Sequence, residues 1–297
     1  MTDISRPKYL YKYRAFNVYT LSLLDSSTAF YADPRTFNDP IDSNPHIDVD
    51  IELPEIEQLF YRLTETSLGP TVAQRDIGYE RYMSTEMGDY KKSTAAAAYY
   101  KGNLVHRILG MLRADIGTRG VLSLAARWNC PLMWSHYADE HRGLCIEYSV
   151  PDADFRHLAP VNYRHTRTIA LSDVYQWKVK KSVDAEAKLI NTIYYAKASD
   201  WRYEREWRDL ETKPGNKAAP ALVTGVIFGC RCDSSIIRAI VKLFDGAAFK
   251  VRFHSIKLND TSFRLNRRPI DAIDVLSSTI QHPGGWEFRD IFSNETD

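Results

Sequence analysis

Two glutamates, Glu204 and Glu206, lie one residue apart in the charged and tryptophan-rich stretch KASDWRYEREWRDLE (197–211). Residues i and i+2 share a face in a strand but lie about 200° apart around a helix. The alternation of EWRDLE favours a strand, which places the two carboxylates side by side at a helix-to-strand junction. Paired carboxylates beside indole rings suit the stabilisation of a sugar cation. The alternative is the solvated end of a helix.

A second group of reactive side chains lies in LMWSHYADEHRGLCIEY (132–148). Ser135, His136 and Tyr137 bring a hydroxyl, an imidazole and a phenol within about one helical turn. His136 is a candidate general base, because the ordinary pKa of histidine lies near neutrality. A buried histidine with satisfied hydrogen bonds is the competing interpretation.

The segment YKYR (11–14) alternates aromatic and basic residues, as a strand beside a cleft would. Lys12 and Arg14 on one face could hold a phosphate, while Tyr11 and Tyr13 on the other offer rings for stacking. An edge strand protected by its charges is the alternative.

The turn FNDPID (37–42) is a further candidate. Asn38 and Asp39 precede Pro40 and can form an Asx-turn. The carboxylates of Asp39 and Asp42 could then serve a ribose or an incoming cation. A rigid turn with a purely structural role is the alternative.

The elements that must position these residues are strands scattered along the chain with helices between them. Apolar residues recur at helical spacing from Leu53 to Ile116, which predicts a helical insertion over 53–116. The strands do not alternate regularly with helices, and no GxGxxG or GxxxxGK[ST] is present, which disfavours a doubly wound parallel sheet. We therefore expect an α+β fold in a single domain over 1–297. Other predicted elements are strands at 9–14, 28–33, 159–164, 206–212 and 249–258, the last as the closing strand. Helices are predicted at 18–24 with Asn17 as N-cap, at 172–199, and at 233–244 with Asp233 as N-cap.

Composition narrows the functional classes. The chain of 297 residues carries 39 Lys and Arg against 38 Asp and Glu, so no global field draws it to nucleic acid, and such contact needs a local patch. No apolar stretch reaches the ~18 residues of a membrane span, and no secretory apolar segment begins the chain. We expect a cytoplasmic protein with no membrane partner. Four scattered cysteines predict no disulfide framework, and we expect no metal.

Taken in order, these motifs resemble a bacterial and phage family known as domain of unknown function 2971. The Trp-Ser-His-Tyr-Ala block followed by Trp-x-x-Glu-x-Glu-x-Arg is the most specific part. The resemblance covers roughly residues 9–229 and leaves the helical segment 53–116 without a matching motif. Its pieces are LYKYRAFNVYTLSLL, FNDPID, LMWSHYADEHRGLCIEY, DWRYEREWR and VIFG.

The opening of the chain is also similar to ADP-ribosyltransferase-like domains, which begin strand, helix, strand and end their site with a late Glu-x-Glu. This similarity implies a mixed or antiparallel sheet core and NAD as substrate. It implies that Glu206 accepts the nicotinamide-ribose hydroxyl, Glu204 orients the acceptor, Arg14 grips phosphate and Tyr137 stacks on nicotinamide. Lys12 stands where many members carry His, and no Ser-Thr-Ser triplet is present.

The resemblances imply an enzyme that consumes NAD, either transferring ADP-ribose to a nucleic acid or protein or hydrolysing NAD. A toxin or antiphage role and an inhibitory partner protein are further expectations. A nuclease using Glu204, Glu206, Asp39 and His136, and a sensor that binds nucleotide without turnover, stay open. The expected catalytic residues are Glu206, Glu204 and His136, and the expected NAD-binding residues are Arg14, Lys12, Tyr13, Ser135, Tyr137, Trp201, Asn38 and Asp39.

Overall fold

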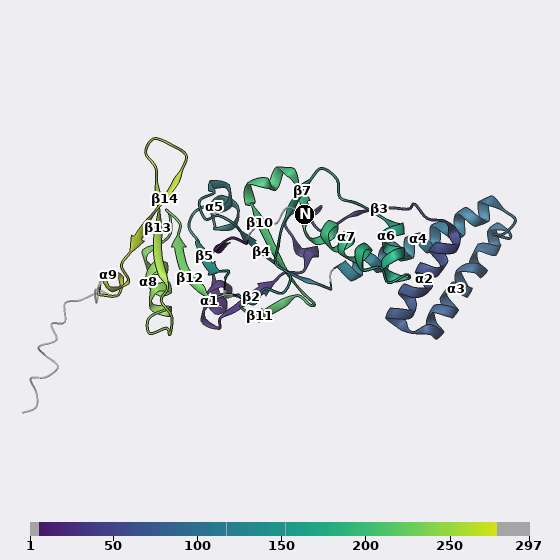
Figure 1. Cartoon of the computed structure of the whole chain (residues 1–297), viewed down its shortest axis with the longest axis horizontal. Helices are drawn as coiled ribbons and strands as arrows, with labels where there is room; N and C mark the ends of the chain where they lie inside the picture. Colours follow the sequence, from purple (N-terminus) through teal and green to yellow (C-terminus); the bar gives the residue numbers. More distant parts are fainter. Residues whose placement is uncertain (1–5, 117, 152, 278–297) are drawn as a thin grey trace, which may run out of the picture.

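A large β-sheet forms the middle of the molecule and separates two helical regions (Figure 1). The computed structural model describes residues 6–116, 118–151 and 153–277. Helices α2, α3 and α4 lie at one end of the long axis, and helices α8 and α9 lie at the other (Figure 1). The fold is thus a mixed α+β arrangement built on one large mixed sheet, as the scattered strands indicated.

The main sheet has eight strands in the order β14-β13-β12-β5-β1-β4-β10-β6. Neighbouring strands run antiparallel except for β12 and β13, which are parallel. Strand β1 is therefore central, and the edge-strand alternative for YKYR is wrong. The bounds are β1 Tyr9–Arg14, β4 Gly120–Ala125, β5 Leu144–Ser149, β6 Ala159–Pro160, β10 Glu206–Glu211, β12 Val223–Phe228, β13 Arg252–Leu258 and β14 Leu265–Ile270.

The sheet splits between β1 and β4. Strand β1 pairs with β5 over its whole length, but its ladder with β4 consists of the single pair Tyr11 and Ala125. Across the opening, the Lys12 ammonium donates a 2.6 Å hydrogen bond to the carbonyl of Ser123. A lysine side chain thus satisfies a carbonyl at the point where the strands diverge, and space is left for a cavity.

Three two-stranded sheets flank the main one. They pair β2 (Thr28–Tyr31) with β11 (Gly215–Ala218), β3 (His46–Asp48) with β8 (Thr168–Ala170), and β7 (Asn162–Arg164) with β9 (Ala196–Ala198). The predicted strand over 159–164 is in fact two strands, because β6 joins the main sheet while β7 turns away to pair with β9.

The segment 53–116 folds into helices α2 (Leu53–Leu68), α3 (Pro70–Ser84) and α4 (Thr94–Ile116), with the short 3₁₀ helix η2 (Thr85–Met87) between α3 and α4. A capping box between Glu52 and Glu55 starts α2, and Gly69, with φ of +89°, ends it. The buried faces of α2 and α4 belong to the same hydrophobic cluster as Val121 of β4 and Leu210 of β10. These helices therefore share one hydrophobic cluster with sheet strands that carry part of the cavity wall.

Shorter helices cover the remaining sheet. Helix α1 (Val18–Asp25) begins where the Asn17 side chain accepts from Thr20 N at 2.9 Å, as predicted. Asp233 caps α8 (Ser234–Leu243) in the same way. The chain also forms helices α5 (Pro131–Tyr137) and α9 (Ala272–Ser277) and the 3₁₀ helices η1 (Pro34–Thr36) and η3 (Ser199–Glu204).

The structure differs from the prediction at two elements, the helix over 172–199 and the strand over 249–258. The single helix expected over 172–199 is two helices, α6 (Leu171–Lys178) and α7 (Val183–Tyr194). Lys181, with φ of +60°, breaks the first, and Ser182 caps the second through Ala185 N. Strand β9 then follows α7 at once. At the other end of the chain β13 does not close the sheet, since β14 pairs with its outer edge.

The close approach of Gly143 to the backbone of Arg14 gives a test of the packing between β1 and β5. A Cβ at Gly143 would lie 2.2 Å from the carbonyl oxygen of Arg14, whereas one at Gly102, exposed in α4, would meet nothing within 4 Å. We expect Gly143→Ala to lower the free energy of unfolding by about 3 kcal/mol, because the backbone must move. Gly102→Ala should raise it by about 0.5–1 kcal/mol through helix propensity. Urea denaturation measures both, and equal effects would contradict the close approach.

Candidate functional site

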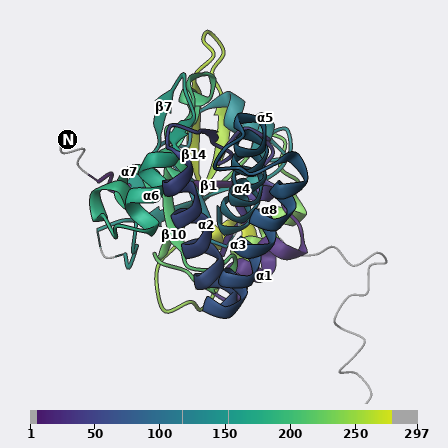
Figure 2. The same ribbon diagram turned by 90° about the vertical axis from the view of Figure 1, so that its right-hand side faces the viewer.

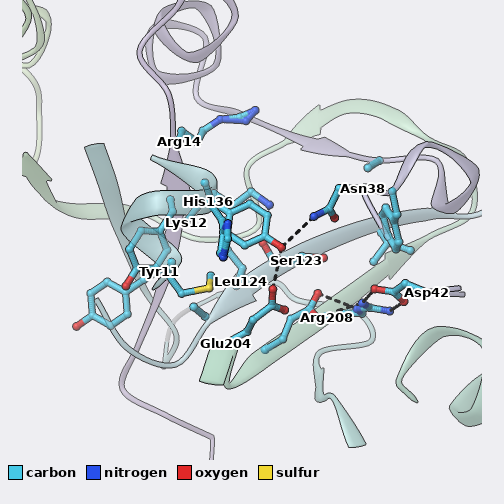
Figure 3. A pocket seen from close by; sticks show the side chains of 18 of the residues that line it. Tyr11, Lys12, Arg14, Asn38, Asp42, Ser123, Leu124, His136, Glu204 and Arg208 are labelled. Atoms are coloured by element: carbon cyan, nitrogen blue, oxygen red, sulfur yellow. Dashed lines mark hydrogen bonds and ion pairs between the residues drawn. The ribbon is translucent and has the colours of Figure 1, made fainter. Parts of the chain in front are cut away.

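A cavity of about 390 Å³ opens at the split in the main sheet (Figure 3). Its walls come from β1, β4, β10, helix α5 and the turn after η1. Arg14 lies on one side, and Glu204, Arg208 and Asp42 lie opposite (Figure 3). Segments far apart in sequence therefore meet around one space.

The best-connected side chain at the site is Arg208, which is 1 % exposed. Its Nε and Nη2 donate to the two carboxylate oxygens of Glu206 at 2.8 and 3.0 Å. Its Nη1 and Nη2 donate to the two carboxylate oxygens of Asp42 at 3.0 and 2.6 Å. A further Nη1 bond of 2.8 Å reaches the carbonyl of Tyr194. All five N–H groups of the guanidinium thus have partners, which holds Asp42 and Glu206 in fixed positions.

Lys197 is the second buried cation. Its Nζ lies 2.5 Å from Glu204 Oε2, 3.3 Å from Glu206 Oε2 and 3.5 Å from Asp42 Oδ2. Burial opposes its charge, but the carboxylates, Glu206 foremost, outweigh this and raise the pKa of Lys197. The ammonium also lies 4.9 Å from the ring centre of Trp201. Lys197 is therefore a permanent cation that bridges the two glutamates.

The two glutamates differ in their electrostatic environment. Burial would raise the pKa of Glu206, but Arg208 and then Lys197 overcome it and hold that pKa well below the usual range. Burial raises the pKa of Glu204, and Lys197 only partly offsets it. Glu206 is therefore a fixed anion, while the pKa of Glu204 lies above that of an ordinary glutamate. Two carboxylates whose pKa values are pushed apart in this way are suited to different roles.

A hydrogen-bonded chain leads from Glu204 along the cavity. The Tyr137 hydroxyl donates to Glu204 Oε1 at 2.8 Å, and Asn38 Nδ2 donates to the Tyr137 oxygen at 3.4 Å. Burial, followed by the charge of Glu204, raises the pKa of Tyr137. The phenol therefore keeps its proton and orients the carboxylate.

The opposite wall is cationic. Burial lowers the pKa of Lys12 to about 8, and the nearby Arg14 adds to this. Burial also lowers the pKa of Arg14, whose Nε donates to Thr20 Oγ1 at 3.4 Å. Arg14 remains charged at physiological pH because arginine pKa values are so high. This wall can hold a phosphate or another anion.

Most of the residues singled out from the sequence meet at this cavity. Those that line it are Lys12, Tyr13, Arg14, Asn38, His136, Tyr137, Glu204 and Glu206. Ser135 does not, and its hydroxyl donates to the carbonyl of Pro131. Asp39 and Trp201 also lie outside the lining. They bind each other through a 2.8 Å bond from Trp201 Nε1, which ties the turn 37–42 to η3.

His136 is exposed, so the interpretation of a buried, satisfied histidine is wrong. Its ring centre lies 6.3 Å from that of Tyr137 and 6.5 Å from those of Trp201 and Tyr203. An accessible imidazole among aromatic rings therefore stands beside the cavity.

The two glutamates lie at a junction of the predicted kind. Glu204 ends η3, Arg205 adopts a left-handed conformation with φ of +47°, and Glu206 begins β10. The sequence reasoning missed the roles of Lys197 and Arg208. The available signal was the presence of both cations within nine residues of a buried Glu-x-Glu, since buried carboxylates need partners.

Two further properties concern metals and membranes. Among the described residues, no group of three or more His, Cys, Asp and Glu side chains has the arrangement of a metal site. No helix in the described ranges is long and apolar enough to cross a bilayer.

Arg208 offers a test of the ion-pair network. We expect Arg208→Met to lower the free energy of unfolding by about 3–5 kcal/mol, because it leaves Asp42 and Glu206 buried without their main partner. Arg202→Ala, at an exposed position in η3, should change it by less than about 0.5 kcal/mol. Chemical denaturation at neutral pH compares them, and a small effect of Arg208→Met would contradict a structural role.

The lowered pKa of Lys12 predicts that the stability of the fold depends on pH. Its pKa is about 8 in the fold against a usual 10.5, so between these values the unfolded chain holds a proton that the folded chain lacks. The free energy of unfolding should therefore rise with pH above 8, until tyrosine ionisation in the unfolded chain opposes it near pH ~10. Lys12→Met should abolish this rise. Denaturation at pH 7 and 9.5 tests this expectation, and parallel pH profiles for the two proteins would disprove it.

The sequence around this site matches a family model. The sequence profile described as "Protein of unknown function (DUF2971)" matches residues 133–208, which contain most of helix α5, Lys197, both glutamates and Arg208. The motifs 10–24, 37–42 and 226–229 lie outside the match. No curated protein and no solved structure matches the chain. The family resemblance indicated by the motifs is thus confirmed over residues 133–208, where the chain matches DUF2971.

Proposed function

We propose that this cavity binds NAD and cleaves the bond between nicotinamide and ribose. The observation that carries the proposal is the pair of glutamates with divergent pKa values facing a cationic wall in one cavity. The carboxylates suit a developing sugar cation, and Lys12 and Arg14 suit the pyrophosphate.

The space around Arg14 supports a two-part ligand. A second cavity of about 600 Å³ shares Tyr13, Arg14, Phe30 and Tyr137 with the first. Its other walls come largely from helix α1 and include the exposed ring of Tyr19. A dinucleotide can place one nucleoside in each cavity and its pyrophosphate at the shared Arg14.

The proposed reaction breaks the glycosidic C–N bond, and its electron pair leaves with nicotinamide, whose ring nitrogen thereby loses its positive charge. The fixed anion Glu206 stabilises the oxocarbenium-like ribose. Water or an acceptor group then bonds to the anomeric carbon and passes its proton to Glu204. Water gives free ADP-ribose, whereas an acceptor gives an ADP-ribosylated product.

This assignment changes the roles that the family similarity implied. Glu206 was expected to accept the ribose hydroxyl, but Arg208 binds both of its oxygens and Lys197 binds one. Among the described residues, the side-chain partners of Glu204 are Tyr137 and Lys197. We therefore assign hydroxyl binding and proton transfer to Glu204 and electrostatic stabilisation to Glu206.

An ADP-ribosyltransferase-like fold belongs to the same proposal. The order β1, α1, β2 and the late Glu-x-Glu at the start of β10 support it. The nuclease alternative needs Asp39 with the other acidic groups, but Asp39 lies outside the cavity lining and binds Trp201. A toxin or antiphage role, a cytoplasmic site of action and an inhibitory partner stay predictions.

Turnover of NAD labelled in its adenylate half tests the proposal. We expect Glu204→Gln to reduce kcat by about 10²–10⁴-fold, because the proton acceptor is lost while the fold is kept. Arg14→Gln should raise KM more than it lowers kcat. Arg202→Ala should retain full turnover.

If NAD stays intact in every mixture that contains the wild-type protein, the proposed enzymatic activity is refuted. A sensor that binds nucleotide without turnover is then favoured. A Glu204→Gln protein with wild-type kcat would refute the assigned base. Label on a polymer distinguishes a transferase from a hydrolase.

A further inference from the structure

A track of aromatic and basic side chains leads from the β13–β14 hairpin to the reaction cavity. We define the aromatic track by Tyr9, Trp128, Tyr203, Trp201 and His136, with Arg252 and Arg267 at its outer end. We propose that it binds a single-stranded nucleic acid, which is then the acceptor of the reaction; this identification of the acceptor rests on the proposed function.

The outer end of the aromatic track combines two rings with two guanidinium groups. Arg252 lies 5.4 Å from the ring centre of Tyr9, and Arg267 lies 5.3 Å from that of Trp128. Both arginines also bind the buried Glu147, at 2.6 and 3.5 Å. Their side chains nevertheless remain 48 % and 36 % exposed. Glu147 therefore fixes the direction of two accessible cations and leaves this group with a net positive charge.

The inner end lies at the cavity. Tyr9, Trp128 and Tyr203 pack, half-buried, against one hydrophobic cluster, which places the two ends on one side of the sheet. Arg127, next to Trp128, donates to the carbonyl of Tyr203 at 2.7 Å. The rings of Tyr203, Trp201 and His136 then follow one another at 5.9 to 6.5 Å. Figures 1 and 2 both show the hairpin loop and α5 on the same upper side of the molecule.

The local charge of the hairpin fits a polyanion, although the whole chain is nearly neutral. Residues 250–268 include six basic side chains and one acidic one, Asp260. The basic ones are Lys250, Arg252, Lys257, Arg264, Arg267 and Arg268. Of these, Arg252 and Arg267 lie on the face of the aromatic track, whereas Lys257 and Arg268 alternate to the other face of the sheet. A basic surface that tracks a phosphate backbone beside rings that stack on bases is the arrangement used for single strands. Bases in a duplex are already stacked and cannot use these rings, which is why we infer a single strand.

The inference is tested by measuring how tightly the protein binds fluorescent single-stranded DNA and RNA of about 16 nucleotides. Fluorescence anisotropy, recorded without NAD, reports this binding. We expect the full chain to bind them more tightly than a duplex of the same length. The double variant Arg252→Gln, Arg267→Gln should weaken binding by about tenfold or more, since both cations are lost. Arg268→Gln is the matched control, because alternation along β14 points it to the opposite face. It should change affinity by less than about threefold.

Because Glu147 is buried, the double variant could lose stability, so thermal unfolding accompanies each measurement. Trp128→Leu keeps every charge and should weaken single-strand binding by about fivefold or more through lost stacking. Equal binding of duplex and single strand, equal losses with Arg268→Gln, or no binding at all would overturn the inference. Transfer of label from NAD only onto protein would also overturn it.

Binding and turnover separate the two proposals. Glu204→Gln should bind the oligonucleotides as the wild type does while losing NAD turnover. If single strands bind but wild type leaves NAD intact, the proposed function fails and the binding surface stands. If NAD is consumed but single strands do not bind, the inference fails and the enzyme stands.

Discussion

The guanidinium of Arg208 is the interaction on which the rest of the site depends. It joins the turn that carries Asp42, the strand that carries Glu206 and the carbonyl at the end of α7. Buried ion pairs contribute little net stability, because desolvating the charges offsets most of their attraction. Their geometry is nevertheless strict, since a buried charge without its partner costs several kcal/mol. Arg208 therefore acts mainly by allowing one arrangement of these three segments.

The cavity follows from a break in regular structure. Where β1 leaves β4, Lys12 replaces a ladder bond and introduces a cation close to the buried carboxylates. Together Lys12, Lys197 and Arg208 face Asp42, Glu204 and Glu206, so opposite charges balance when Lys12 is protonated. An anionic ligand at Arg14 or a positively charged nicotinamide ring would each alter this balance locally. Electrostatics thus connects the open strand pair to the chemistry proposed for the cavity.

The sequence allowed the strands and the junction at Glu204 and Glu206 to be predicted, because period-two alternation and helix caps act over a few residues. Asn17 and Asp233 cap helices where their spacing indicated. The partners of the glutamates could not be derived in the same way. Asp42 and Arg208 are 166 residues apart, and only the packed sheet brings them together. The left-handed conformation of Lys181 between α6 and α7 was likewise not predicted, because the spacing of apolar residues along a helix carries no information about it.

A pair of adjacent carboxylates is useful only if the two differ, and backbone geometry produces the difference here. Arg205, in its left-handed conformation, turns the chain between η3 and β10, so that Glu204 meets a phenol and one ammonium while Glu206 meets a guanidinium as well. A regular strand would give both side chains the same face and similar neighbours. With the turn, one carboxylate stays charged and the other can exchange a proton. The same turn leaves Tyr203 half-buried beside His136, so the geometry that separates the glutamates also forms the inner end of the aromatic track.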